Sequence, residues 1–293
     1  MNGFILIDKP SGPTSHDIVR QVRRLCGGAK AGHSGTLDPL ASGLLVCAVG
    51  DATRLLEFLP AEPKRYLFGI TFGTETDTLD KEGKVVSGGG RVPSESEVSA
   101  VLPRFAGSIA QTPPKFSAVL VNGERAYDLA RANREFTLAE RTITIFSLAL
   151  VRYDGQAGEA SLEVTCSSGT YVRSLVKDIA GALGTPGYAS FIRRLAVGPF
   201  SVENAVAPDA LSRGAAAFVV PVARALSTVP SVVLAYDQIQ AVATGKNIRI
   251  DKSDGIVVAY DDKGGVVAVL SKDMGSYHPD KVFVRPAMNG KEN

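Results

Sequence analysis

Apolar and polar residues follow a helical or a strand-like period over most of the chain. Residues 4–7, Phe-Ile-Leu-Ile, predict a short buried strand, and the Pro/Gly-rich turn after them leads to Ser15 as the expected N-cap of a helix. The apolar residues of that helix recur at helical spacing on one face: Ile18, Val19, Val22 and Leu25. The chain therefore begins with a strand, a turn and an amphipathic helix.

Later segments alternate between the two periods. Residues 66–78 are rich in β-forming residues and end in a polar loop, and residues 143–154 and 160–169 predict a strand pair around a glycine-containing turn. Ser94 and Glu97 have the spacing of a capping box, which predicts a helix over 95–105. Residues 170–184 predict a helix that ends at its final glycine.

The end of the chain has a different texture. Short apolar runs at 231–236, 255–271 and 281–287 predict strands, and Asp-Asp-Lys-Gly-Gly at 261–265 predicts a tight hairpin. We expect an α+β protein with a domain boundary near Pro230, which separates residues 1–229 from a small β-rich module at 230–293.

Composition narrows the class of protein. Of 293 residues, 45% are hydrophobic and 21% are charged, which favours a sizeable core over disorder. The net charge of +2 means that any basic surface must be local. Three scattered cysteines suggest neither a disulfide framework nor a metal site, and no apolar run is long enough to span a bilayer. The expectation is a soluble cytoplasmic protein without a signal peptide.

The stretch GHSGTLDPLASGLL, residues 32–45, is the strongest candidate for chemistry. Asp38 precedes Pro39, which holds it out of the helical region, and Gly32 and Gly35 allow close approach of the backbone. The apolar run that follows anchors the far side of this loop in the core. A carboxylate held in this way is either a nucleophile, a base or a metal ligand, or it only caps a turn.

Other reaction classes have weaker support in the residues. The three histidines, His16, His33 and His278, show no paired metal-ligand spacing. A glycoside hydrolase needs a second carboxylate, for which Asp77 and Asp80 are candidates if they are more than an acidic turn. A serine hydrolase would need a Gly-x-Ser-x-Gly elbow, which the chain lacks.

An ordered set of motifs resembles the TruB type of the pseudouridine synthase family, which acts at position 55 of transfer RNA. The stretch at 32–45 is similar to the catalytic motif of that family. Five further stretches match its motifs in order: DKPSGPTSHDIV (8–19), KRYLFGITFGTETDTLDKEG (64–83), QTPPKFSAVLVNGERAYDLAR (111–131), CSSGTYVRSL (166–175) and FIRRLAVGPF (191–200). Because the set spans most of residues 3–200, it is far more specific than any one motif.

The resemblance implies a fold and a reaction. The fold is a mixed, largely antiparallel central sheet with flanking helices, an RNA-gripping insertion at about 107–135, and a C-terminal PUA-like RNA-binding module. The reaction is isomerisation of uridine to pseudouridine in the TΨC loop by base flipping, without a cofactor or a metal. The implied partner is the T arm of transfer RNA, with no membrane and no obligate protein partner, and the protein is expected to be a monomer.

The resemblance also implies roles for residues of the site. Asp38 would assist glycosidic cleavage as nucleophile or base, Arg173 would pair with it, and Tyr66 would stack on the flipped uracil. Five further substrate-binding positions are expected: His33, Asp80, Ile192, Lys9 and Arg194. His33 would fill the space that the base vacates, and Asp80 could bridge to Arg173. Ile192 stands where the family usually has leucine, and Lys9 is expected to buttress the cleft. Phosphate contacts are expected from Lys115, Arg125, Arg131 and Arg134.

Two other hypotheses stay open. The first is a non-catalytic protein that binds and folds RNA with the same flipping and clamping surface. The second is a carboxylate glycoside hydrolase, which would release a free base or sugar.

Within the insertion, Leu120 stands where the family often has lysine, so the details of the RNA grip can differ.

Overall fold

A mixed sheet of nine strands forms the main body of the computed structural model, which describes residues 1–284. Its strands are β1 (Gly3–Lys9), β2 (Ala31–Ser34), β3 (Ser42–Val49), β4 (Lys64–Phe72), β7 (Gly107–Gln111), β10 (Arg141–Asp154), β11 (Glu159–Cys166), β12 (Gly187–Val197) and β13 (Phe200–Ser201). The order is β1-β3-β12-β4-β11-β10-β7, with β2 on β3 and β13 on β12. Among the strands of this sheet that the structure describes, only β3 and β12 pair in parallel, so the predicted mixed and largely antiparallel sheet is confirmed.

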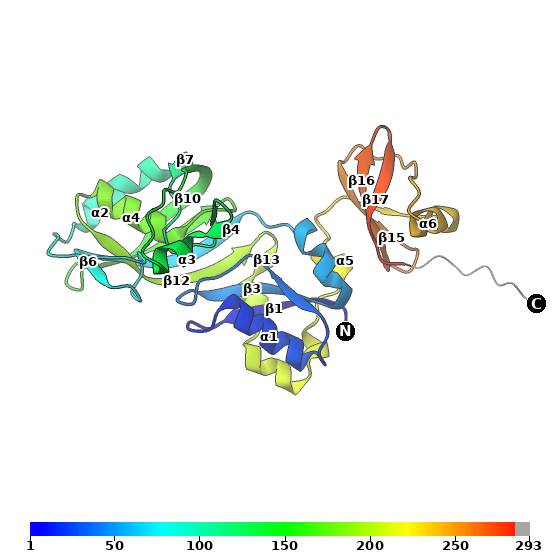
Figure 1. The fold of residues 1–293 in the computed structure, drawn as a ribbon, viewed down its shortest axis with the longest axis horizontal. Helices are drawn as coiled ribbons and strands as arrows, with labels where there is room; N and C mark the ends of the chain where they lie inside the picture. The colour runs from blue at the N-terminus through cyan, green and yellow to red at the C-terminus, as the bar shows by residue number, and fades with distance from the viewer. Residues whose placement is uncertain (285–293) are drawn as a thin grey trace, which may run out of the picture.

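Helices cover the sheet at its two ends. The α-helices of this body are α1 (Ser15–Leu25), α2 (Glu95–Val101), α3 (Ala126–Arg131), α4 (Val172–Ala182) and α5 (Val222–Ala225). Five 3₁₀ segments join them: η1 (Gly50–Phe58), η2 (Leu102–Phe105), η3 (Val202–Asn204), η4 (Pro208–Arg213) and η5 (Ala215–Phe218). Figure 1 shows α1 beside β1 and β3, and α2 and α4 at the opposite end of the sheet near β7 and β10. Long β12 runs between these two ends.

The predicted first helix is confirmed, with a shift of its cap. Ile18, Val19 and Val22 are buried in the main apolar cluster, and Leu25 packs against it. The N-cap is Thr14 rather than Ser15, because the Thr14 hydroxyl and the Asp17 carboxylate form the reciprocal bonds of a capping box. Ser15 is freed for another contact: its Oγ donates to the carbonyl oxygen of Leu37 at 3.0 Å.

The later local predictions also hold in outline. The capping box of Ser94 and Glu97 starts α2, but the α-helix ends at Val101 and continues as the 3₁₀ turn η2, which contains Pro103. β10 and β11 form the predicted antiparallel pair. α4 ends just before Gly184, whose φ of 69° allows the chain to leave the helix.

Two small hairpins project from the body. One pairs β5 (Glu75–Thr76) with β6 (Val85–Ser87) and frames the acidic loop after β4. The other pairs β8 (Leu120–Val121) with β9 (Glu124–Arg125) inside the expected insertion. The first hairpin thus begins in the motif at 64–83 and extends beyond it, and the second lies within the expected insertion at 107–135.

A second sheet forms from the end of the chain. Its strands are β14 (Ser231–Val233), β15 (Ile256–Tyr260), β16 (Val266–Asp273) and β17 (Ser276–Val282), and the hairpin at 261–265 is confirmed. It has its own apolar cluster around Val242, Val257 and Tyr277, and Figure 1 shows it beside the main body. Val258 and Val269 instead join Phe4 in a cluster shared with the main body. The boundary near residue 230 and the PUA-like assignment stay predictions.

The structure corrects two details of this module. Residues 236–243, Tyr236–Ala243, form the helix α6, which the strand pattern did not indicate. The last strand is β17 and not 281–287, since residues 283 and 284 lie outside any strand and 285–287 lie outside the described residues. β17 contains Pro279, which disguised it in the sequence; proline is tolerated there because β17 is an edge strand. No helix within residues 1–284 is long and apolar enough to cross a membrane.

Candidate active site

The loop that carries Asp38 connects β2 to β3, and the side chain of Lys9 holds it in place. Lys9 ends β1 and is fully buried. Its Nζ donates to the carbonyl oxygens of Pro10 (2.9 Å), Pro13 (2.7 Å) and Pro39 (3.3 Å). Burial lowers the pKa of Lys9 to about 8, although the nearby Asp38 carboxylate opposes this shift. The predicted buttress is thus a lysine that ties two proline-rich turns together.

Arg194 fixes the same loop from the side of β12. Its Nε donates to the Leu44 carbonyl at 2.7 Å and its Nη2 to the Gly35 carbonyl at 3.0 Å, while Nη1 makes a longer bond of 3.4 Å to Thr36. The side chain is 1% exposed. Arg194, expected among the substrate-binding residues, therefore positions the catalytic loop through Nε and Nη2, while Nη1 keeps only the long bond to Thr36.

Arg173 joins the catalytic loop to two other segments. From the first turn of α4, its Nε donates to Asp38 Oδ2 at 2.9 Å, its Nη1 to the Thr78 carbonyl at 2.8 Å and its Nη2 to the Phe116 carbonyl at 2.9 Å. Its side chain is 5% exposed, whereas that of Asp38 is 38% exposed. The guanidinium is therefore a buried anchor, and it presents a carboxylate that solvent or substrate can reach.

Asp80 completes this charged network, as expected. Its Oδ2 lies 3.7 Å from Arg173 Nε, and its Oδ1 accepts from Thr78 Oγ1 at 2.7 Å and from the Glu82 amide at 3.1 Å. Asp77, the other candidate for a second acid, is exposed and caps the turn through the Lys84 amide at 2.8 Å. The structure thus separates the two: Asp80 faces the arginine and Asp77 stabilises the hairpin loop.

Tyr66 lies on β4 directly opposite Arg194 on β12. It is 7% exposed, and burial raises the pKa of its phenol, although the Arg194 guanidinium opposes the rise. The Asp38 carboxylate also acts on the pKa of Tyr66, so the phenol is close to both charged groups. A buried aromatic side chain therefore lies within electrostatic reach of the carboxylate.

His33 and Ile192 lie on the strands that border the loop. His33 is in β2, burial lowers the pKa of its ring, and its buried Nδ1 has no hydrogen-bond partner within residues 1–284. Ile192 pairs with Phe68 and is buried in the main apolar cluster. The two residues supply a neutral ring and an apolar wall to this part of the molecule.

The four expected phosphate contacts are all exposed and all lie on the insertion. The guanidinium groups of Arg125 and Arg131 lie 5.9 and 5.4 Å from the ring centre of Tyr127. Arg134 pairs with Glu124 at 2.7 Å, and Lys115 stands in the stretch that leads to Phe116. All four cations are thus exposed on the insertion, whose Phe116 carbonyl accepts from Arg173.

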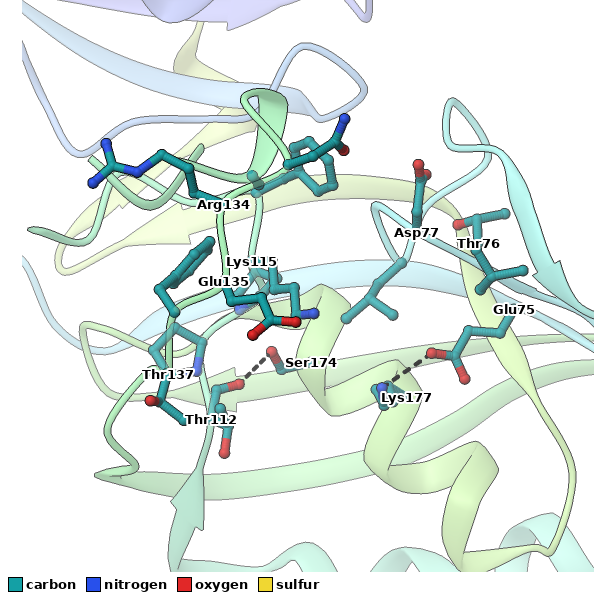
Figure 2. Close-up of a pocket in the computed structure, with 18 of the residues that line it drawn as sticks. Glu75, Thr76, Asp77, Thr112, Lys115, Arg134, Glu135, Thr137, Ser174 and Lys177 are labelled. Atoms are coloured by element: carbon teal, nitrogen blue, oxygen red, sulfur yellow. Dashed lines mark hydrogen bonds and ion pairs between the residues drawn. The ribbon is translucent and has the colours of Figure 1, made fainter. Parts of the chain in front are cut away.

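A cavity of about 1140 Å³ separates the insertion from α4 and the β5 hairpin. In Figure 2, Ser174 donates to the Thr112 carbonyl at 2.7 Å, and Lys177 pairs with Glu75 at 3.0 Å. Asp38 and Tyr66 do not line this cavity. It borders the Arg173 network through Phe116 and Ser174, so the base of the insertion is attached to the element that holds the catalytic loop.

Sequence reasoning missed three groups that build this site. The carbonyl oxygens of Thr78 and Phe116 orient Arg173, and Ser15 Oγ both donates to and accepts from the backbone of Leu37. A backbone carbonyl that accepts a hydrogen bond cannot be recognised from the residue type. The two prolines at 113 and 114, shortly before Phe116, do indicate a backbone of restricted conformation. No group of three or more His, Cys, Asp or Glu side chains within the described residues is placed to hold a metal.

Comparisons with known proteins agree with this geometry. A family model described as TruB family pseudouridylate synthase (N terminal domain) matches residues 23–172. The tRNA pseudouridine synthase B of Aquifex aeolicus is 40% identical over 281 residues, which are 92% of this chain and 98% of the relative. That of Thermobifida fusca is 40% identical over 294 residues, 96% and 98% of the two chains. A chain in a crystal structure of a Cbf5-Nop10-Gar1 complex is 26% identical, with a TM-score of 0.71 over 97% of this chain and 85% of that one.

Proposed function

The chain belongs to the TruB family of pseudouridylate synthases, and on that premise we propose that it converts uridine to pseudouridine at position 55 in the TΨC loop of transfer RNA. The observation that carries the proposal is the pair formed by a partly exposed Asp38 and a buried Arg173. The buried guanidinium fixes the carboxylate in one orientation through a charge-assisted hydrogen bond of 2.9 Å.

The reaction moves one bond without gain or loss of atoms. The N1–C1′ bond of uridine breaks, the uracil turns, a C5–C1′ bond forms, and the proton of C5 is replaced by one on N1. Arg173 engages Oδ2 of Asp38, and Oδ1 has no hydrogen-bond partner within residues 1–284. Oδ1 is thus the oxygen that faces the reacting nucleotide and meets the positive charge that develops at C1′.

The substrate base must leave its stack before it reaches Asp38. Extrusion of a base costs a few kcal/mol, and stacking on an aromatic side chain returns about 1–3 kcal/mol. Tyr66 supplies that aromatic surface, Ile192 an apolar wall, and His33 fills the place that the base leaves. Asp80 keeps Arg173 oriented, while Lys9 and Arg194 keep the catalytic loop in position.

The insertion and the C-terminal module provide the grip on the RNA. Lys115, Arg125, Arg131 and Arg134 are exposed cations suited to phosphates of the T arm. We assign residues 1–229 to the catalytic domain and 230–293 to a PUA-like RNA-binding module. The protein is expected to act as a monomer in the cytoplasm. A reducing compartment of this kind fits its three buried free cysteines.

Mass mapping of pseudouridine tests the proposal. Purified protein is incubated with unmodified transfer RNA without added metal or nucleotide, and one modified site in the T arm is expected. A protein that binds the RNA but forms no pseudouridine on any transfer RNA would leave only the binding hypothesis. Release of free uracil without a C–C nucleoside would instead support the glycoside hydrolase.

A further inference from the structure

Lys64, the first residue of β4, is a half-buried cation without a partner. Its ammonium has no hydrogen bond or ion pair within residues 1–284. The acid closest to it along the chain, Glu62, uses its Oε1 to accept from the Ser168 amide at 2.7 Å. A charged group that loses water without gaining a partner is costly, so its position calls for a ligand.

The ammonium of Lys64 lies beside Gly35, in the loop that carries Asp38. A methyl group built on Gly35 would lie 3.7 Å from Lys64 Nζ and 3.5 Å from Arg194 Nη1. Gly35 is exposed and has a φ of 84°. A group placed where the Gly35 side chain would be is therefore in ordinary contact distance of two cationic groups, and the exposed Gly35 leaves this position accessible to solvent.

Both cations can serve an additional anion. Nη1 of Arg194 makes only the long bond of 3.4 Å to Thr36, and Nζ of Lys64 makes none among the described residues. Burial lowers the pKa of Lys64, and the positive charge of Arg194 lowers it further. An oxyanion between the two groups would relieve this repulsion and supply the missing acceptor.

We propose that the space at Gly35 is a phosphate subsite, in which Lys64 Nζ and Arg194 Nη1 hold an oxygen of an RNA phosphate that flanks the target uridine. The inference rests on the proposed function, since it identifies where that substrate is fixed. Gly35 precedes Asp38 by three residues, so the chain between them spans at most about 10 Å. A phosphate next to the nucleotide whose sugar meets Asp38 is therefore within reach of the subsite.

The test measures binding of unmodified transfer RNA by Lys64→Gln and Lys64→Met over a range of KCl concentrations. Each variant is expected to bind about 5–10-fold more weakly at low salt, and the slope of log affinity against log salt should fall by about 0.7, the value for one phosphate contact on a single strand. Lys64→Met keeps the apolar stem, which guards against loss of packing. Arg104→Gln removes the same charge from an exposed side chain of η2 and should change affinity less than 2-fold.

A substituted substrate locates the contact. The two phosphates that flank the target uridine are replaced one at a time by neutral methylphosphonates. At one of the two positions wild type should lose affinity about 5–10-fold and Lys64→Gln should lose no more, because the contact is already absent. The subsite is refuted if both Lys64 variants bind like wild type, or if Lys64→Gln is as sensitive as wild type at both positions.

Pseudouridine formation by the wild type is measured on the same samples. If the wild type forms no pseudouridine but binding still depends on Lys64 and on one phosphate, the proposed function fails while the subsite stands. If the wild type is active and the Lys64 variants match it in affinity and salt slope, only the subsite fails. The two proposals can thus be judged separately.

Discussion

Replacement of Arg173 by methionine would show how much the site depends on one buried cation. The substitution keeps much of the apolar stem but removes every donor that reaches Asp38, Thr78 and Phe116. It also leaves Asp80, which is 6% exposed, without the positive charge beside it. Loss of one partner from a buried pair costs about 3–5 kcal/mol, because the remaining charge stays buried.

A second substitution separates the cost of the stranded Asp80 carboxylate from the cost of the lost hydrogen bonds. In Arg173→Met/Asp80→Asn the stranded carboxylate becomes neutral, so about 1–3 kcal/mol should return despite a second substitution. The two lost carbonyl bonds stay lost, so the double variant should still be less stable than wild type. Activity should not return, because Asp38 no longer has its anchor.

The assay is urea unfolding of the four members of this cycle, with melting temperatures as a second readout. At about 2–4 °C per kcal/mol, Arg173→Met should melt roughly 10 °C below wild type. Arg152→Met is the matched control, because Arg152 is 75% exposed and its ion pair with Asp154 is 3.8 Å long; it should cost under about 0.5 kcal/mol. The reasoning is refuted if Arg173→Met costs less than 1 kcal/mol, or if Asp80→Asn deepens the loss.

Further predictions concern the support of the catalytic loop. The pKa of Lys9 is lowered from 10.5 to about 8, so between these values the unfolded chain keeps a proton that the folded chain has released. The unfolding free energy of wild type relative to Lys9→Met should therefore rise from pH 8 to pH 10.5, by up to about 3 kcal/mol in urea titrations, and a flat difference would contradict the assigned burial. Gly43→Ala places a methyl group 2.3 Å from the Arg194 carbonyl oxygen at a φ of 97°, and calorimetry should find a loss of about 2 kcal/mol or more. Gly181→Ala in α4 is the control for Gly43→Ala, since nothing lies within 4 Å of the new methyl group. This variant should be neutral or stabilised by up to about 1 kcal/mol. Equal losses of stability in the two variants would refute the steric argument.

Local chemistry explains why several elements could be predicted from the sequence. The spacing of Ile18 and Val22 and the pair Ser94–Glu97 act within one or two helical turns, so their patterns survive in any fold. The same holds for the hairpin at 261–265, whose turn residues carry their own conformational preference. α6 was missed because its eight residues bury only Val242 fully, which leaves a weak period.

The assembly of the site could not be derived from such patterns. Asp38 and Arg173 are 135 residues apart in the chain, and Asp8 and Arg193, which form a bidentate pair, are 185 apart. Sheet order brings them together, since β12 is inserted between β3 and β4. Motif resemblance predicted the meeting of Asp38, Arg173 and Asp80 and placed Arg194 among the substrate-binding residues. It did not indicate that Arg194 is buried and holds the loop, because burial depends on packing that spacing does not encode.

The rate of a single turnover by Asp38→Asn tests the central claim most directly. The substitution keeps the size of the side chain and one oxygen that can accept from Arg173, so the affinity for transfer RNA should stay within a few-fold of wild type. With RNA in saturating excess, pseudouridine should not form above background, while wild type converts the T-arm uridine in the same samples. Pseudouridine formed by Asp38→Asn at the wild-type rate would contradict a chemical role for this carboxylate.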